Sequence, residues 1–102
     1  MSIQQEKAAL ARIITALLPL GWEPCKLDDG GDDLIDLSHM DTEDVVENCA
    51  AVDMCHLHFR DEACRVATVV IIWGNSPEEL IADATMSHGF DEALEQAGAW
   101  QE

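Results

Sequence analysis

The sequence predicts an α+β fold, a four-stranded antiparallel sheet made of two hairpins and packed with three to four helices. Apolar residues recur at helical spacing near both ends of the chain and over residues 41–51, which is typical of amphipathic helices. Two pairs of short β-rich segments, each joined by turn residues, lie between these helices and indicate hairpins. The chain has 102 residues, so we expect residues 1–102 to form a single domain.

The first helix is expected to begin at Ser2, which forms a capping-box pattern with Gln5. Its apolar positions follow helical spacing, at Leu10, Ile13, Ile14, Leu17 and Leu18. Pro19 and Gly21 should end it, because proline cannot continue a helix and glycine suits its end.

The first hairpin should pair Trp22–Leu27 with Leu34–Ser38. Gly30 and Gly31 in the turn between them supply the positive φ angles that a tight turn needs. The second hairpin should pair Val52–Phe59 with Cys64–Trp73. The segment Val69–Trp73 is apolar on both faces, which indicates a central strand that is covered on both sides or lies at an interface.

A helix from Asp41 to about Ala51 is expected between the hairpins, with Asp41 and Asp44 at its start. Its inward positions would be Val45, Val46 and Cys49, and its outward positions Glu43, Asp44 and Glu47. After the second hairpin, Ser76-Pro77-Glu78-Glu79 predicts a helix start. This helix would bury Leu80, Ile81 and Ala84 and stop at His88-Gly89, and a last helix would bury Phe90, Ala93, Leu94, Ala97 and Trp100.

The charge of the chain is strongly negative, with a formal net charge of −16 from 21 acidic and 5 basic residues. The bases Lys7, Arg12, Lys26, Arg60 and Arg65 are scattered, which argues against direct nucleic-acid binding and against anionic membranes. No run of about 18 apolar residues is present, and the N-terminus lacks a signal-peptide pattern. We therefore expect a cytosolic protein whose four cysteines are reduced and behave as small hydrophobes.

Much of this charge is local. Nine acids and no base lie between Asp28 and Glu47: Asp28, Asp29, Asp32, Asp33, Asp36, Asp41, Glu43, Asp44 and Glu47. Such a cluster could hold a metal, perform acid–base chemistry, imitate nucleic-acid phosphates, or only keep the surface soluble. Residues 28–33 fit the EF-hand loop poorly, because the acids come in adjacent pairs and His39 stands at the twelfth position.

Catalysis by a carboxylate would need an apolar pocket that shifts its pKa. Asp83, expected on a helix between Ile81 and Ala84, is the best placed for a buried role, although a capping role suits it better. The sequence contains no phosphate-cradling glycine loop and no nucleophile elbow. We therefore expect no enzymatic activity and no cofactor.

A second metal candidate is the pair His56 and His58, with Cys55 beside them and Cys49 and Cys64 nearby in the sequence. The spacing differs from that of zinc-binding pairs. On a strand, His56 and His58 point one way and Cys55 the other. The two histidines alone could therefore provide only half a site, which a partner chain would complete.

From Val70 onward, an apolar strand and a Gly-Asn turn, Ile71-Ile72-Trp73-Gly74-Asn75, are followed by Glu79, by Ile81-Ala82-Asp83-Ala84-Thr85, and by a terminal helix with Leu94 and Trp100. In this pattern the last third of the chain resembles small phage and prophage proteins of uncharacterised function. The resemblance implies a bacterial or phage setting and a non-catalytic α+β fold, without an active site. In size and charge the chain is also similar to anti-CRISPR and other anti-defence inhibitors, to DNA mimics, and to bacterial immunity proteins.

The leading interpretation is a non-enzymatic inhibitor in the bacterial cytosol. Its nine carboxylates between residues 28 and 47 would bind a basic nucleic-acid-handling protein. One alternative is a small zinc or calcium module that uses His56 and His58 or the acidic turn 28–33, and another is an immunity protein against a basic toxin. A further alternative is a homodimer whose interface combines the strand Val69–Trp73 with exposed tryptophans.

Overall fold

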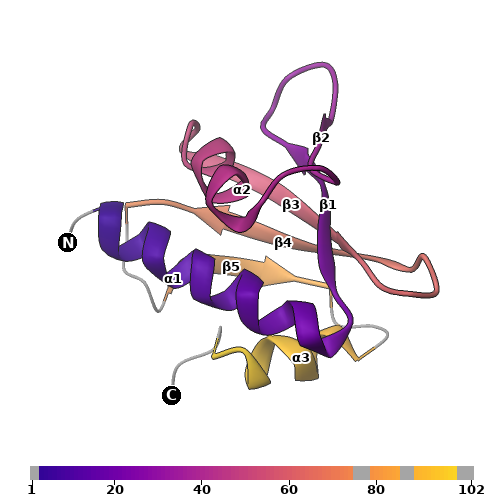
Figure 1. Ribbon diagram of the computed structural model, residues 1–102. Coiled ribbons are helices and arrows are strands. Elements are labelled where there is room, and N and C mark those ends of the chain that lie inside the picture. Colours follow the sequence, from indigo (N-terminus) through magenta and orange to yellow (C-terminus); the bar gives the residue numbers. More distant parts are fainter. Residues whose placement is uncertain (1–2, 75–78, 86–88, 99–102) are drawn as a thin grey trace.

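The alternation of apolar and polar residues in the middle of the chain produces an antiparallel sheet with one buried face (Figure 1). The computed structural model describes residues 3–74, 79–85 and 89–98. Its strands are β1 (Glu23–Asp28), β2 (Ile35–Asp36), β3 (Met54–Arg60), β4 (Val66–Ile72) and β5 (Ile81–Ala84), in the order β2-β1-β3-β4-β5. Its helices are α1 (Ile3–Leu17), α2 (Thr42–Cys49) and α3 (Phe90–Gln96), with the 3-10 turn η1 (Leu18–Leu20) after α1. The α+β class and both hairpins are confirmed, but the sheet has five strands instead of four.

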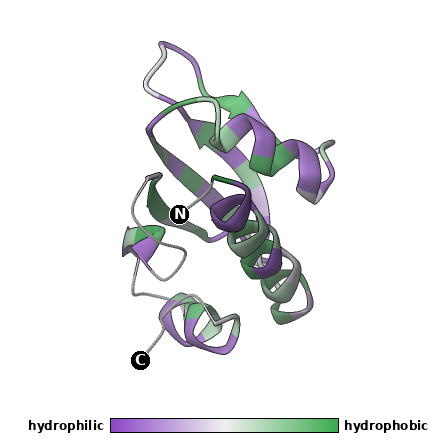
Figure 2. Ribbon diagram, turned by 90° about the vertical axis from the view of Figure 1, so that its left-hand side faces the viewer, coloured by the Kyte–Doolittle hydropathy of each residue, from purple (hydrophilic) through white to green (hydrophobic). Residues whose placement is uncertain are grey.

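One face of the sheet forms the core. In β3 and β4 every second side chain is buried, namely Cys55, Leu57 and Phe59 on β3 and Ala67, Val69 and Ile71 on β4. Helix α1 contributes Leu10, Ile13, Ile14 and Leu17 to the same core, and α2 contributes Val45, Val46 and Cys49. Figure 2 shows α1 and α2 on the same side of the sheet. The opposite, open face carries the remaining side chains of the strands.

The helix predicted to follow Gly74 is wrong for residues 81–84, which form strand β5. Its cap residues Ser76 and Pro77 lie outside the described residues. Strand β5 pairs antiparallel with β4, with Val70 opposite Asp83, and the Thr85 amide donates to the Thr68 carbonyl at 2.9 Å. Without this partner the outer edge of β4 would expose a row of unpaired backbone groups. Pairing along a long apolar strand therefore outweighs the local helix signal.

The predicted ends of the first two helices are largely confirmed. Gly21 adopts φ +97°, and its amide donates to the Leu18 carbonyl at 3.0 Å, which ends the turn after α1. Asp41 caps α2, because its Oδ1 accepts from the Asp44 amide at 2.9 Å. The predicted cap at Ser2, the stop at His88 and the helical position of Trp100 lie outside the described residues.

Of the two alternatives predicted for Val69–Trp73, coverage on both faces within the chain is wrong, and a position at an interface stays a prediction. Strand β4 is an interior strand of the sheet, but Val70 and Ile72 are half-buried on the open face. The expected exposure of the tryptophans is also wrong for Trp22, which lies in the core, and Trp73 is half-buried and donates its Nε1–H to the Cys49 carbonyl at 2.9 Å. Trp100 lies outside the described residues. The structure therefore provides no tryptophan-rich surface among the residues it describes.

Three of the four cysteines behave as small core residues, as predicted. Cys25, Cys49 and Cys55 are buried, whereas Cys64 is exposed in the β3–β4 turn at φ +61°. The pKa of the Cys49 thiol is raised, first by its hydrogen bond to Cys55 and then by burial. All four side chains are free thiols.

Candidate functional site

The nine predicted acids lie around one end of the molecule, which we call the acidic rim. Asp28 and Asp36 are on the open face of the sheet, because they pair across strands with His56 and Lys26. Asp29, Asp32 and Asp33 lie in the loop 29–34, and Asp41, Glu43, Asp44 and Glu47 lie at the start and along the outer side of α2. Figure 1 shows the loop and α2 in the same half of the molecule, in the upper part of the view. The structure thus gathers the acids at one end but spreads them over both layers, not over a single flat face.

Several of these carboxylates are held in place by backbone amides close in sequence. Asp28 Oδ1 accepts from the Gly30 amide and Asp29 Oδ1 from the Gly31 amide, each at 3.0 Å. Such turns are a common use of aspartate, because its short side chain reaches the backbone two residues ahead. Gly30 has φ +92°, which supports the chain reversal. The loop 29–34 therefore begins as an ordered turn that fixes two carboxylates.

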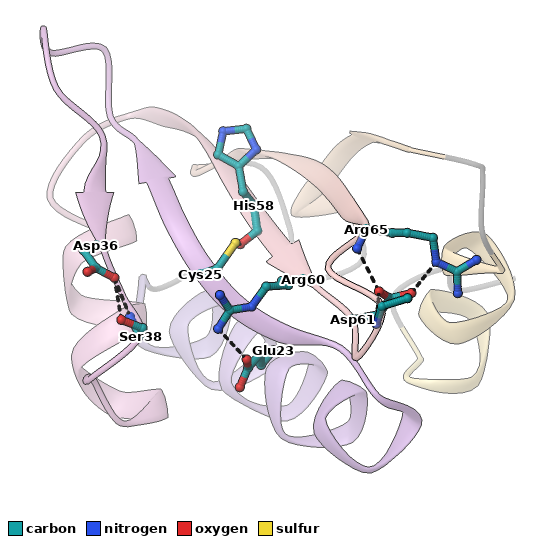
Figure 3. A network of polar contacts seen from close by, with 9 residues as sticks. Glu23, Cys25, Asp36, Ser38, His58, Arg60, Asp61 and Arg65 are labelled. Atoms are coloured by element: carbon teal, nitrogen blue, oxygen red, sulfur yellow. Dashed lines mark hydrogen bonds and ion pairs between the residues drawn. The ribbon is translucent and has the colours of Figure 1, made fainter.

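Asp36 is fixed in a similar way on the edge strand β2. Its Oδ1 accepts from the Ser38 hydroxyl at 2.7 Å and from the Ser38 amide at 3.0 Å (Figure 3). These bonds, first of all the one from the hydroxyl, lower the pKa of Asp36. Asp36 consequently keeps its negative charge further into the acidic range than an ordinary aspartate does.

Few of the rim acids are neutralised within the chain. Lys26 lies 4.0 Å from Asp36, and Lys7 lies 3.2 Å from Glu47. In residues 3–74, 79–85 and 89–98, no lysine or arginine forms an ion pair with any of the other seven rim acids. The two remaining ion pairs, Arg60 with Glu23 and Arg65 with Asp61, belong to the opposite end of β3 (Figure 3). The rim therefore carries most of its charge uncompensated.

The catalytic candidate Asp83 is not buried. It is exposed on β5, opposite Val70 on the open face, and its Oδ1 lies 2.9 Å from the Ala84 amide. The expectation of a buried role is wrong because it assumed a helix at this position.

The prediction that His56 and His58 point to one side of their strand and Cys55 to the other is confirmed. His56 and His58 are half-buried on the open face, whereas Cys55 points into the core. His58 Nδ1 lies 2.7 Å from Thr68 Oγ1, and His56 lies opposite Asp28. Among the residues that the structure describes, no group of three or more His, Cys, Asp and Glu side chains is arranged to hold a metal ion. Within the described residues, neither the pair His56 and His58 nor the turn 28–33 therefore has the further ligands that a metal site needs.

The pH dependence of stability should report on His58. Its pKa is lowered, mainly because burial disfavours the imidazolium, and the nearby His56 adds to this while Asp28 opposes it. As the pH falls through about 6.5, the unfolded chain binds the proton before the folded one. The stability contributed by the neutral His58 ring is therefore lost progressively from about pH 6.5 down toward its folded-state pKa. An NMR titration should give a His58 pKa below about 6.5. When the pH is lowered from 7 to 5, the free energy of unfolding should fall less for the His58→Asn variant than for the wild type. A His58 ring that titrates above its ordinary value would contradict this prediction.

A groove between α1 and α2 adjoins the acidic rim and was not found from the sequence. It has a volume of about 400 Å³ and is lined by Gln4, Lys7, Ala8, Ala11, Thr42, Glu43, Val46 and Glu47. The ion pair between Lys7 and Glu47 links its two walls. No local signal could reveal this pair, because its members are 40 positions apart.

A larger hollow of about 560 Å³ lies at the opposite end of β3, between η1, the β3–β4 turn and α3. Its Asp61 accepts from the amides of Ala63 and Arg65 and from Arg65 Nε. These bonds shape the turn, so the side chain of Asp61 is engaged in holding the backbone.

No protein-family model matches this chain, and no curated protein or solved structure is significantly similar to it. Within the described residues, no helix is both long and apolar enough to cross a membrane.

Proposed function

We propose that this protein is a non-enzymatic inhibitor that binds a cationic surface of a nucleic-acid-handling protein through its acidic rim. The observation that carries this proposal is that seven of the nine rim acids have no basic partner among the described residues. Charge of one sign at one end of a small domain raises the rate of encounter with an oppositely charged surface.

The arrangement of the rim favours binding over solubility alone. A solubilising charge needs no fixed positions, whereas Asp28, Asp29 and Asp36 are each held by at least one backbone amide. Asp41 is likewise engaged as the cap of α2. Carboxylates fixed before binding lose less conformational entropy when a partner docks.

A phage-encoded inhibitor of the anti-CRISPR or DNA-mimic kind, acting in the cytosol of a bacterial host, agrees with this proposal. The acids are spread over the sheet and the helical layer. This arrangement favours an inhibitor whose acidic rim covers a basic groove, and it is less suited to imitating a flat row of phosphates. An immunity protein against a basic toxin would use the same surface. The partner class is the same in each case, a basic protein that handles nucleic acid.

The test begins with capture of the partner from a nuclease-treated bacterial lysate at low salt, with identification by mass spectrometry. Binding kinetics are then compared for the wild type and for a variant with Asp32→Asn, Asp33→Asn, Glu43→Gln and Asp44→Gln. All four side chains are exposed, so the fold should persist. The association rate at low salt should fall about tenfold or more.

The matched control removes four exposed acids elsewhere, with Glu62→Gln, Asp83→Asn, Glu92→Gln and Glu95→Gln. It changes the net charge of the chain by the same amount and should leave most of the association rate intact. Equal rates for both variants would mean that total charge, not the rim, governs the encounter, and the proposal would then be wrong.

A further inference from the structure

The groove between α1 and α2 has an apolar floor that is open to solvent. Ala8 is exposed, Ala11 is half-buried, and Val46 lies beneath them in the core. Ala8 and Ala11 are three positions apart and therefore share one face of α1. Because both are small, an incoming element can approach the α1 backbone closely at this place.

One wall of the groove belongs to the acidic rim. Glu43 and Glu47 line it from α2, four residues apart, which is about 6 Å along the helix at 1.5 Å per residue. Lys7, the basic residue among the described lining, is held by both oxygens of Glu47 at 3.2 Å. Glu43 and its neighbour Asp44 have no such partner within the described part of the chain. The apolar floor is thus bordered by uncompensated negative charge.

We infer that this groove receives a basic amphipathic helix of the partner protein, an inference that rests on the proposed function. Such a helix would place apolar side chains at positions i and i+3 or i+4 over Ala8, Ala11 and Val46. A lysine or arginine on its flank would then face Glu43, the acid of this wall that has no basic partner among the described residues. A second copy of this chain is a poorer occupant, because each copy brings a net charge of −16 to the same contact.

The probe is a labelled 18-residue peptide of leucine, alanine and lysine with its leucines at helical spacing. A second peptide has the same composition and charge in scrambled order, so that it has no apolar face. At physiological salt the amphipathic peptide should bind the full-length protein about tenfold more tightly than the scrambled one, since exposed charge pairs are weakened by screening and apolar contacts are not. Equal affinities would overturn the inference.

Substitutions in the groove locate the binding. Ala8→Gln with Ala11→Gln fills the floor without changing the charge and keeps good helix formers on α1. This variant should lose the roughly tenfold advantage of the amphipathic peptide and leave the affinity for the scrambled peptide unchanged. The control is Thr15→Gln, which changes an exposed position of the same helix outside the groove lining and should keep the advantage.

Amide chemical-shift changes in the unmodified protein provide a second measurement that no folding defect can affect. The amphipathic peptide should shift the amide signals of residues 8–11 and 42–47, and shifts confined to other parts of the chain would overturn the inference.

If the rim variant loses the captured partner while the groove variant still prefers the amphipathic peptide, the inference fails and the proposed function stands. If the groove binds the peptide while the rim variant captures the partner normally, the proposed function fails instead. Light scattering of the protein alone should give a monomer, and a dimer broken by the groove substitutions would assign the groove to a second copy.

Discussion

Phe90→Ala should lower the free energy of unfolding by about 3–5 kcal/mol, the usual cost of removing a fully buried aromatic ring. Phe90 begins α3 and is fully buried. Its ring lies edge-on to Trp22, with a centroid distance of 4.9 Å, and 5.6 Å from the ring of Phe59. The three rings connect α3 to the end of η1 and to the sheet. Loss of the Phe90 ring leaves a cavity where three separate segments meet, so little relaxation can fill it.

Urea unfolding followed by far-UV circular dichroism measures this change. The control is Leu18→Ala, which removes a large apolar side chain that is 45% exposed and should cost much less. A loss below about 1 kcal/mol for Phe90→Ala would contradict a docked α3, because surface substitutions alone reach about 0.5 kcal/mol. A shift of the midpoint at constant slope would show that the substitution changed stability and not the surface exposed on unfolding.

Much of the fold follows from local patterns in the sequence. The alternation over Val52–Phe59 predicts which side chains of β3 are buried, and Asp41 predicts the start of α2. Strand β5 could not be predicted in this way, because Leu80, Ile81 and Ala84 fit an inward helical face as well as a strand. The deciding interaction is non-local, since the edge of β4 needs a partner and residues 81–84 supply it.

The candidate site shows the same division between local and non-local information. The nine acids are visible as a sequence cluster, and the inward and outward positions of α2 agree with its pattern. Their division between the open face, the loop 29–34 and the helical layer depends on how β2 and α2 pack, which no local spacing encodes. The groove depends on the contact between α1 and α2, and the ion pair of Lys7 with Glu47 is likewise a product of tertiary packing.

Glu6 is the least expected element of the core and leads to the second large effect. It lies in the first turn of α1, yet it is only 2% exposed. Its two carboxylate oxygens accept from the Gly74 amide at 3.0 and 3.2 Å. Gly74 follows β4 and has φ +97°, so this contact ties the start of α1 to the end of the interior strand β4.

Glu6→Ala should lower the free energy of unfolding by about 2–3 kcal/mol, because it removes a part-buried hydrogen bond to a charged acceptor. Glu6→Gln keeps a side chain of similar size with one acceptor oxygen, so it should cost about 1 kcal/mol, the net value of an ordinary hydrogen bond. Urea unfolding of both variants tests this order, and Gln5→Ala, at the exposed neighbouring position, serves as the control. Equal losses for Glu6→Ala and Glu6→Gln would mean that the negative charge stabilises the contact, for which the N-terminal end of the α1 dipole offers a reason. A smaller loss for Glu6→Gln would mean that the acceptor oxygen itself holds β4 against α1.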